Sequence, residues 1–172
     1  MGRSSAYWKS NLYLSEEVEP EPGAPLQDLS PALAARFSAV RDGLLQIPGA
    51  AEQVRFMGPM WHWAWEYGIG NRKLCWLHLM KSSVDVTFTL SEGDESRLSK
   101  GGKLAAVLAR ALLEAQRTGP VKWCWLELND RRTIEAFLNL ARKKAEWLAE
   151  RPAPRRAPRL HGGRGGEAAE TD

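Results

Sequence analysis

Residues 59–68, PMWHWAWEYG, are the stretch from which the expected fold is built. Trp61, Trp63 and Trp65 stand at alternate positions in it. Alternate side chains of a β-strand point to the same face of a sheet, whereas a helix would spread them around its circumference. The spacing therefore predicts a strand that carries three indoles on one face.

Three further strands are predicted beside this one, at residues 74–80 (LCWLHLM), 84–90 (VDVTFTL) and 121–128 (VKWCWLEL). The second of them alternates strictly between apolar and polar residues, which is typical of a strand with one buried face. Its predicted inward residues are Val84, Val86, Phe88 and Leu90, and its predicted outward residues are Asp85, Thr87 and Thr89.

Three amphipathic helices are predicted around the strands. The first follows Ser30 and Pro31, which suit a helix N-terminus, and carries an apolar stripe as far as Ile47. The second covers residues 103–116, and the third follows Asp130 and runs to about residue 148. Residues 91–103 are expected to be a polar loop, and residues 50–57 suit either a helical turn or a lead-in to the first strand.

The element order is then α-β-β-β-α-β-α. This order predicts an α+β fold with a mostly antiparallel four-stranded sheet and helices packed on one face. Residues 30–150 should form this single domain. Residues 1–29 are expected to be an N-terminal arm and a flexible linker with no folded element between 15 and 29, and the Arg-, Pro- and Gly-rich residues 151–172 are expected to be disordered.

Composition favours a cytoplasmic protein with neither a membrane nor a nucleic acid as its partner. The net charge is only +3, and five arginines lie at 151–166, outside the predicted domain. No apolar run approaches the ~20 residues that span a bilayer, and residues 1–10 lack the apolar core of a secretory signal. Cys75 and Cys124 are expected to be buried thiols, with a disulfide or a reactive thiol as the alternatives.

The same order and spacing resemble the YdhG-like superfamily, small bacterial domains mostly of unknown function. The matching segments, over roughly residues 30–150, are IPGA, EYG, VDVTFTL, VKWCWLELND and IEAFLNLARKKAEWL. Some relatives are described as frataxin-like iron chaperones, so the resemblance implies iron delivery as one possible function. It implies no site residues, because none of these segments is a catalytic signature.

The sheet face that the helices leave open is the candidate binding surface. A large open apolar face is typical of a ligand groove or a partner surface. The residues expected to bind a ligand there are Trp61, Trp63, Trp65, Trp76, His78, Trp123 and Trp125. The tryptophans of the first strand join this face only if that strand lies in a compatible register. The alternative is that residues 6–14 (AYWKSNLYL) cover the face as a lid.

Metal binding is a separate hypothesis. His62 and His78 lie on neighbouring predicted strands near Glu66, and two imidazoles with a carboxylate suit a transition metal. Hydrogen-bonded structural histidines are the simpler alternative. A group of acidic residues in the predicted polar loop offers oxygen ligands to iron, or is solvated surface: Glu92, Asp94 and Glu95.

The sequence therefore predicts a noncatalytic binding module that uses an aromatic sheet face for an unknown small molecule or protein. The alternative is a frataxin-like iron-binding chaperone. No nucleotide-binding, metalloprotease or nucleophile-elbow motif occurs, so neither a catalytic residue nor a cofactor is predicted.

Overall fold

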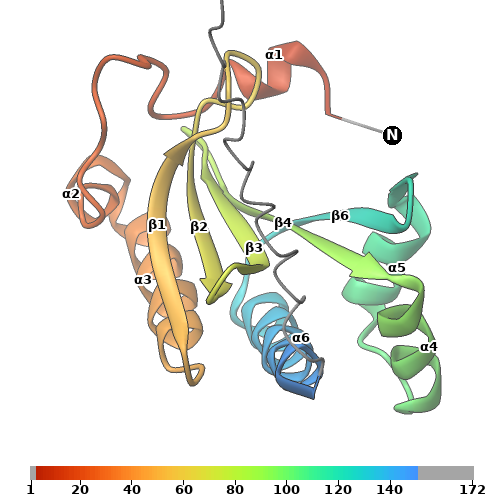
Figure 1. The fold of residues 1–172 in the computed structure, drawn as a ribbon. Helices are drawn as coiled ribbons and strands as arrows, with labels where there is room; N and C mark the ends of the chain where they lie inside the picture. The colour runs from red at the N-terminus through yellow and green to blue at the C-terminus, as the bar shows by residue number, and fades with distance from the viewer. Residues whose placement is uncertain (1–2, 151–172) are drawn as a thin grey trace, which may run out of the picture.

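Six antiparallel strands form one sheet, in the order β1-β2-β3-β4-β6-β5, in the computed structural model (Figure 1), which describes residues 3–150. The strands are β1 (Ala50–Phe56), β2 (Trp63–Ile69), β3 (Arg72–Leu79), β4 (Val84–Ser91), β5 (Gln116–Thr118) and β6 (Val121–Glu127). The helices are α1 (Ser5–Trp8), α2 (Pro25–Asp28), α3 (Pro31–Leu45), α4 (Glu92–Lys100), α5 (Ala106–Glu114) and α6 (Arg131–Glu150). The predicted disordered tail at 151–172 lies outside the described residues.

The α+β class is confirmed, but the prediction of four strands is wrong. The two additional strands, β1 and β5, lie at the edges of the sheet. In β1 only Val54 is buried, and all three residues of β5 are exposed. In β1 the less exposed positions include Glu52 as well as Val54 and Phe56, so apolar and polar residues do not alternate, and β5 is too short to show a pattern.

Helix α4 occupies most of the stretch that was expected to be a polar loop, so that prediction is also wrong. Ser91 and Asp94 form a capping box at its start: the Asp94 N–H donates to Ser91 Oγ over 3.2 Å, and the Ser91 N–H donates to Asp94 Oδ2 over 2.9 Å. Among its own residues only Asp94 and Leu98 are buried, which explains the missing apolar stripe.

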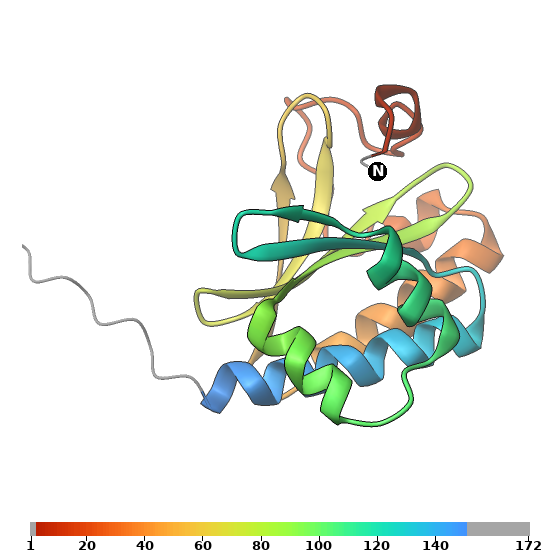
Figure 2. The same cartoon turned by 90° about the vertical axis from the view of Figure 1, so that its right-hand side faces the viewer.

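The hydrophobic core lies between the sheet and the helices α3, α4, α5 and α6. The inward residues predicted for β4, from Val84 to Leu90, are buried, and Phe88 lies 5.8 Å from Phe137 of α6 between ring centroids. Helices α3 and α6 approach closely at Gly43, where a Cβ would overlap the Leu138 side chain. Figures 1 and 2 show α3, α4 and α6 on one side of the sheet and α1 on the other.

The N-terminal stretch is bound along the sheet and not detached from it. The Leu12 N–H donates to the Leu79 carbonyl over 2.8 Å, and the Lys81 N–H donates to the Ser10 carbonyl over 2.8 Å. Further along, α2 contradicts the expectation that no folded element lies between residues 15 and 29. None of the described helices is both long and apolar enough to cross a membrane.

Candidate functional site

The sheet face opposite the core helices carries most of the predicted aromatic surface. In the register of the sheet, Trp76 pairs with Thr87, His78 with Asp85 and Thr87 with Trp125. These side chains therefore share one face with Trp123. The ring of Trp76 stacks on that of Trp123, with centroids 5.4 Å apart, and Trp76 Nε1 donates to Glu66 Oε2 over 2.8 Å.

Trp63 and Trp65 lie on the other face, so the structure does not bring them to this surface. Trp65 pairs with Val54 and Leu77, and its ring contacts Phe37 of α3 at 6.0 Å between centroids. Both indoles are part of the core, at 6% and 0% exposed. The first strand is thus in the register that turns its tryptophans towards the helices.

Trp61 reaches the aromatic surface from outside the strand. It precedes β2 in a turn in which His62 has a φ of 58°, a left-handed conformation that is uncommon for a residue other than glycine. The indole of Trp61 contacts Trp123 and Trp8, each at 6.1 Å between ring centroids. The three alternate tryptophans of the sequence therefore do not form one row.

The N-terminal arm, residues 3–11, covers part of this face. The Trp8 ring meets the His78 ring edge to face at 4.9 Å, and the Trp125 Nε1–H donates to the Tyr7 hydroxyl over 3.1 Å. The Tyr7 hydroxyl in turn donates to Asp85 Oδ2. Asn11 is fully buried, and its Nδ2 donates to the carbonyls of Trp61 and Trp63 over 3.2 and 3.1 Å. The arm is therefore anchored at both the sheet and the turn before β2.

Between the arm and α5 a cavity of about 800 Å³ remains open beside β6. Its lining includes four tryptophans, one polar residue of β3 and one of β4: Trp8, Trp61, Trp123, Trp125, His78 and Thr87. Of the predicted ligand-binding residues on this face, Trp76 stacks on Trp123 but is not part of this lining. The arm thus covers the face only in part and itself forms one wall of the cavity.

His78 keeps a neutral imidazole at the floor of this cavity. It is 2% exposed, and burial lowers its pKa from 6.5 to about 3. Its Nε2 lies 2.8 Å from Thr87 Oγ1, while its Nδ1 is buried with no hydrogen-bond partner among the described residues. A buried polar atom without a partner costs free energy, so this nitrogen weakens the packing at the cavity floor.

Asp85, directly across from His78, is a buried carboxyl beneath the arm. It is 0% exposed, and burial raises its pKa from 3.8 to about 6, against the opposing effect of the Tyr7 hydrogen bond. Burial and the neighbouring Asp85 also raise the pKa of the Tyr7 hydroxyl, which keeps it a proton donor.

The proposed histidine metal site does not assemble. His62 packs against Phe56, with ring centroids 6.5 Å apart, whereas His78 contacts Trp8. Glu66 accepts hydrogen bonds from Trp76, Lys73 and Arg55. Across residues 3–150, no group of three or more His, Cys, Asp or Glu side chains is arranged to hold a metal ion.

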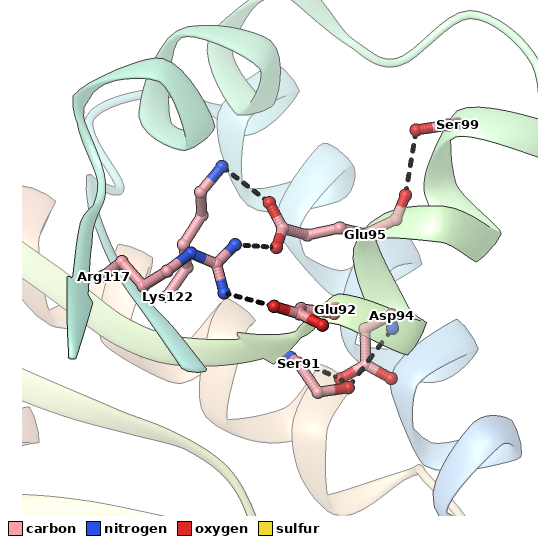
Figure 3. Close-up of polar contacts among 7 residues, drawn as sticks. All are labelled: Ser91, Glu92, Asp94, Glu95, Ser99, Arg117 and Lys122. Carbon is pink, nitrogen blue, oxygen red and sulfur yellow. Dashed lines mark hydrogen bonds and ion pairs between the residues drawn. The ribbon is translucent and has the colours of Figure 1, made fainter. Parts of the chain in front are cut away.

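The acidic residues suggested for iron have other partners (Figure 3). Glu95 forms an ion pair with Arg117 and another with Lys122, in which Lys122 Nζ lies 2.6 Å from Glu95 Oε1. Glu92 Oε1 lies 3.9 Å from Arg117 Nη1. Asp94 belongs to the capping box of α4. Glu92 and Glu95 therefore join α4 to the β5–β6 hairpin, and the three acids do not form an open group of oxygen ligands.

Sequence reasoning missed the contribution of α5 and of Arg3 to this site. Ala111 and Glu114 of α5 line the cavity, and the Arg3 guanidinium lies 3.3 Å from the centroid of the Trp125 ring. The sequence signal for the arm was its aromatic content, which led to two alternative expectations: an open sheet face, or a face covered by the arm as a lid.

Comparison of the chain with protein-family models, with curated proteins and with solved structures found no match.

Proposed function

We propose that this protein is a noncatalytic binding protein that takes a small, largely apolar molecule into the cavity beside β6. The observation that carries the proposal is the cavity itself, about 800 Å³ in volume and walled by Trp8, Trp61, Trp123 and Trp125. Ligand pockets commonly have volumes of roughly 300–1,000 Å³, with apolar walls and a few polar groups that orient the ligand. His78 and Thr87 are such groups here.

The chemistry of the lining favours binding over catalysis. Thr87 and His78 resemble a nucleophile and its base, but a histidine with a pKa of about 3 is a weak base near neutral pH. In catalytic triads an acidic group orients the histidine, and His78 Nδ1 has no such partner among the described residues. Burial also raises the pKa of the Cys124 thiol, which lines the cavity, to about 11, so it remains protonated.

The relationship to the YdhG-like superfamily and a cytoplasmic location remain part of this proposal. The relationship rests on the order of segments over residues 30–150. The location rests on Cys75 and Cys124, which are both buried and unpaired, as is usual in a reducing compartment.

A dye titration tests the proposal. N-phenyl-1-naphthylamine is uncharged and becomes fluorescent in apolar surroundings, so the wild-type protein should bind it saturably at one site. Trp123→Ala removes one wall of the cavity and should weaken binding by about tenfold, since an aromatic contact contributes about 0.5–1.5 kcal/mol beyond the area it buries.

Trp147→Ala is the matched control, because Trp147 lies on α6 and is not part of the cavity lining. It should bind the dye as the wild type does. Dye binding that is absent from the wild type, or that both substitutions reduce equally, would contradict the proposed site.

A further inference from the structure

One wall of the cavity already holds a positive charge. The Arg3 guanidinium lies 3.3 Å from the centroid of the Trp125 ring and 5.3 Å from that of the Tyr7 ring. The negative face of an aromatic ring attracts cations, and tryptophan attracts them most strongly. Arg3 thus occupies the position that the charged group of a cationic ligand would take.

The groups around this position favour a cation more than an anion. Among the described lining residues, Arg3 is the only cation, and Glu114 is an exposed carboxylate whose Oε1 pairs with Arg110 Nε over 2.9 Å. Glu127 pairs with Asp85 across the β4–β6 ladder, so two further carboxyl groups lie on the same sheet face. His78 adds no positive charge near neutral pH, because burial lowers its pKa to about 3.

We propose that the cavity binds a small organic cation of the alkylated ammonium class, whose charged group displaces Arg3 from the Trp125 ring. This inference rests on the proposed function and adds the chemical class of the ligand. An alkylated ammonium suits indole walls, because its methyl groups make apolar contacts while its charge meets the aromatic faces.

The test compares three probes of nearly the same shape: choline, which is positively charged, 3,3-dimethylbutan-1-ol, which is neutral, and 3,3-dimethylbutanoate, which is negatively charged. Isothermal titration calorimetry measures the binding of each to the whole chain. Choline should bind at least about threefold more tightly than the alcohol, because cation attraction to a half-buried indole such as Trp125 is of that size. The carboxylate should bind most weakly.

Arg3→Ala should strengthen choline binding, because the competing guanidinium is gone. Lys9→Ala is the matched control: it removes a positive charge from an exposed residue of the same arm that does not line the cavity. It should leave choline binding close to that of the wild type.

Equal binding of choline and the alcohol would overturn the inference. So would tightest binding of the carboxylate, lost on Arg3→Ala, since Arg3 would then be an anion receptor. The naphthylamine titration separates the two proposals: if the dye binds at the Trp123 wall and choline does not bind, the inferred ligand class is wrong and the binding function stands.

Discussion

Asp85 and His78 are paired across β3 and β4, and their titrations should change stability in opposite directions. Burial raises the pKa of Asp85 from 3.8 to about 6, so the folded protein holds this proton more tightly than the unfolded chain does. Its contribution to stability is complete at acid pH and is lost as the pH rises to about 6. At about 1.4 kcal/mol for each tenfold change in proton affinity, the loss is about 3 kcal/mol.

The corresponding change at His78 has the opposite sign. Burial lowers its pKa from 6.5 to about 3, so stability is lost as the pH falls through this range, by about 5 kcal/mol in total. Between about pH 4 and pH 6 the two contributions cancel, because one group takes up a proton on folding while the other releases one. Removing either residue should therefore expose the pH dependence of the other.

Asp85→Asn keeps an acceptor for the Tyr7 hydroxyl and removes the titration. The free energy of unfolding of this variant, minus that of the wild type, should rise by about 3 kcal/mol between about pH 3.5 and pH 7. For His78→Gln the same difference should instead rise by about 4 kcal/mol as the pH falls over that range. Urea denaturation at a series of pH values measures both, and the groups common to the proteins cancel in the difference.

Glu127→Gln removes an exposed carboxylate directly across the ladder from Asp85, and its charge is a minor cause of the raised Asp85 pKa. Its difference from the wild type should therefore rise in the same direction as that of Asp85→Asn, but by much less. A difference between Asp85→Asn and the wild type that stays constant from about pH 3.5 to pH 7 would refute the burial argument for Asp85.

Three further predictions concern packing. Phe88→Ala should cost roughly 3–5 kcal/mol in urea denaturation, because Phe88 is 1% exposed and packs on Phe137; a loss below about 1 kcal/mol would contradict its place in the core. Ser91→Ala should cost about 0.5–2 kcal/mol by loss of the α4 cap, whereas an unchanged denaturation midpoint would show that the cap contributes nothing. Deleting residues 1–14 should lower the Tm and shift tryptophan emission to the red, because the arm covers the indoles of the sheet; a silent deletion would mean that it does not pack there.

Elements whose pattern is complete within one segment could be predicted from the sequence. The alternation of β4 identified its buried side, and the apolar stripe of α3 from Leu33 to Leu44 identified the face that packs on the core. Asp130 was correctly predicted to cap α6: it accepts a hydrogen bond from the Thr133 N–H over 2.8 Å. In each case the signal depends only on neighbouring residues.

The orientation of β2 could not be predicted in this way, because it depends on its partners. Alternation indicates that Trp63 and Trp65 share a face, but pairing of Trp65 with Leu77 selects the core face. The pairing of β2 with β3 also shifts register between Tyr67 and Gly68. A glycine is needed at this shift, because a Cβ at Gly68 would lie 2.6 Å from the Arg72 carbonyl oxygen. The cavity likewise combines residues as distant in sequence as Trp8 and Trp125, which no local pattern relates.

The core tryptophans also hold the stretch that leads from the arm to α3. Trp63 Nε1 donates to the Ser15 carbonyl over 2.7 Å, and Trp65 Nε1 donates to the Pro22 carbonyl over 2.9 Å. The chain between these two positions is thus fixed through main-chain atoms, which every amino acid supplies. Homologues whose residues 15–22 differ completely in sequence should therefore follow the same path as long as they keep both indoles, and alignment scores over this stretch would understate the structural similarity.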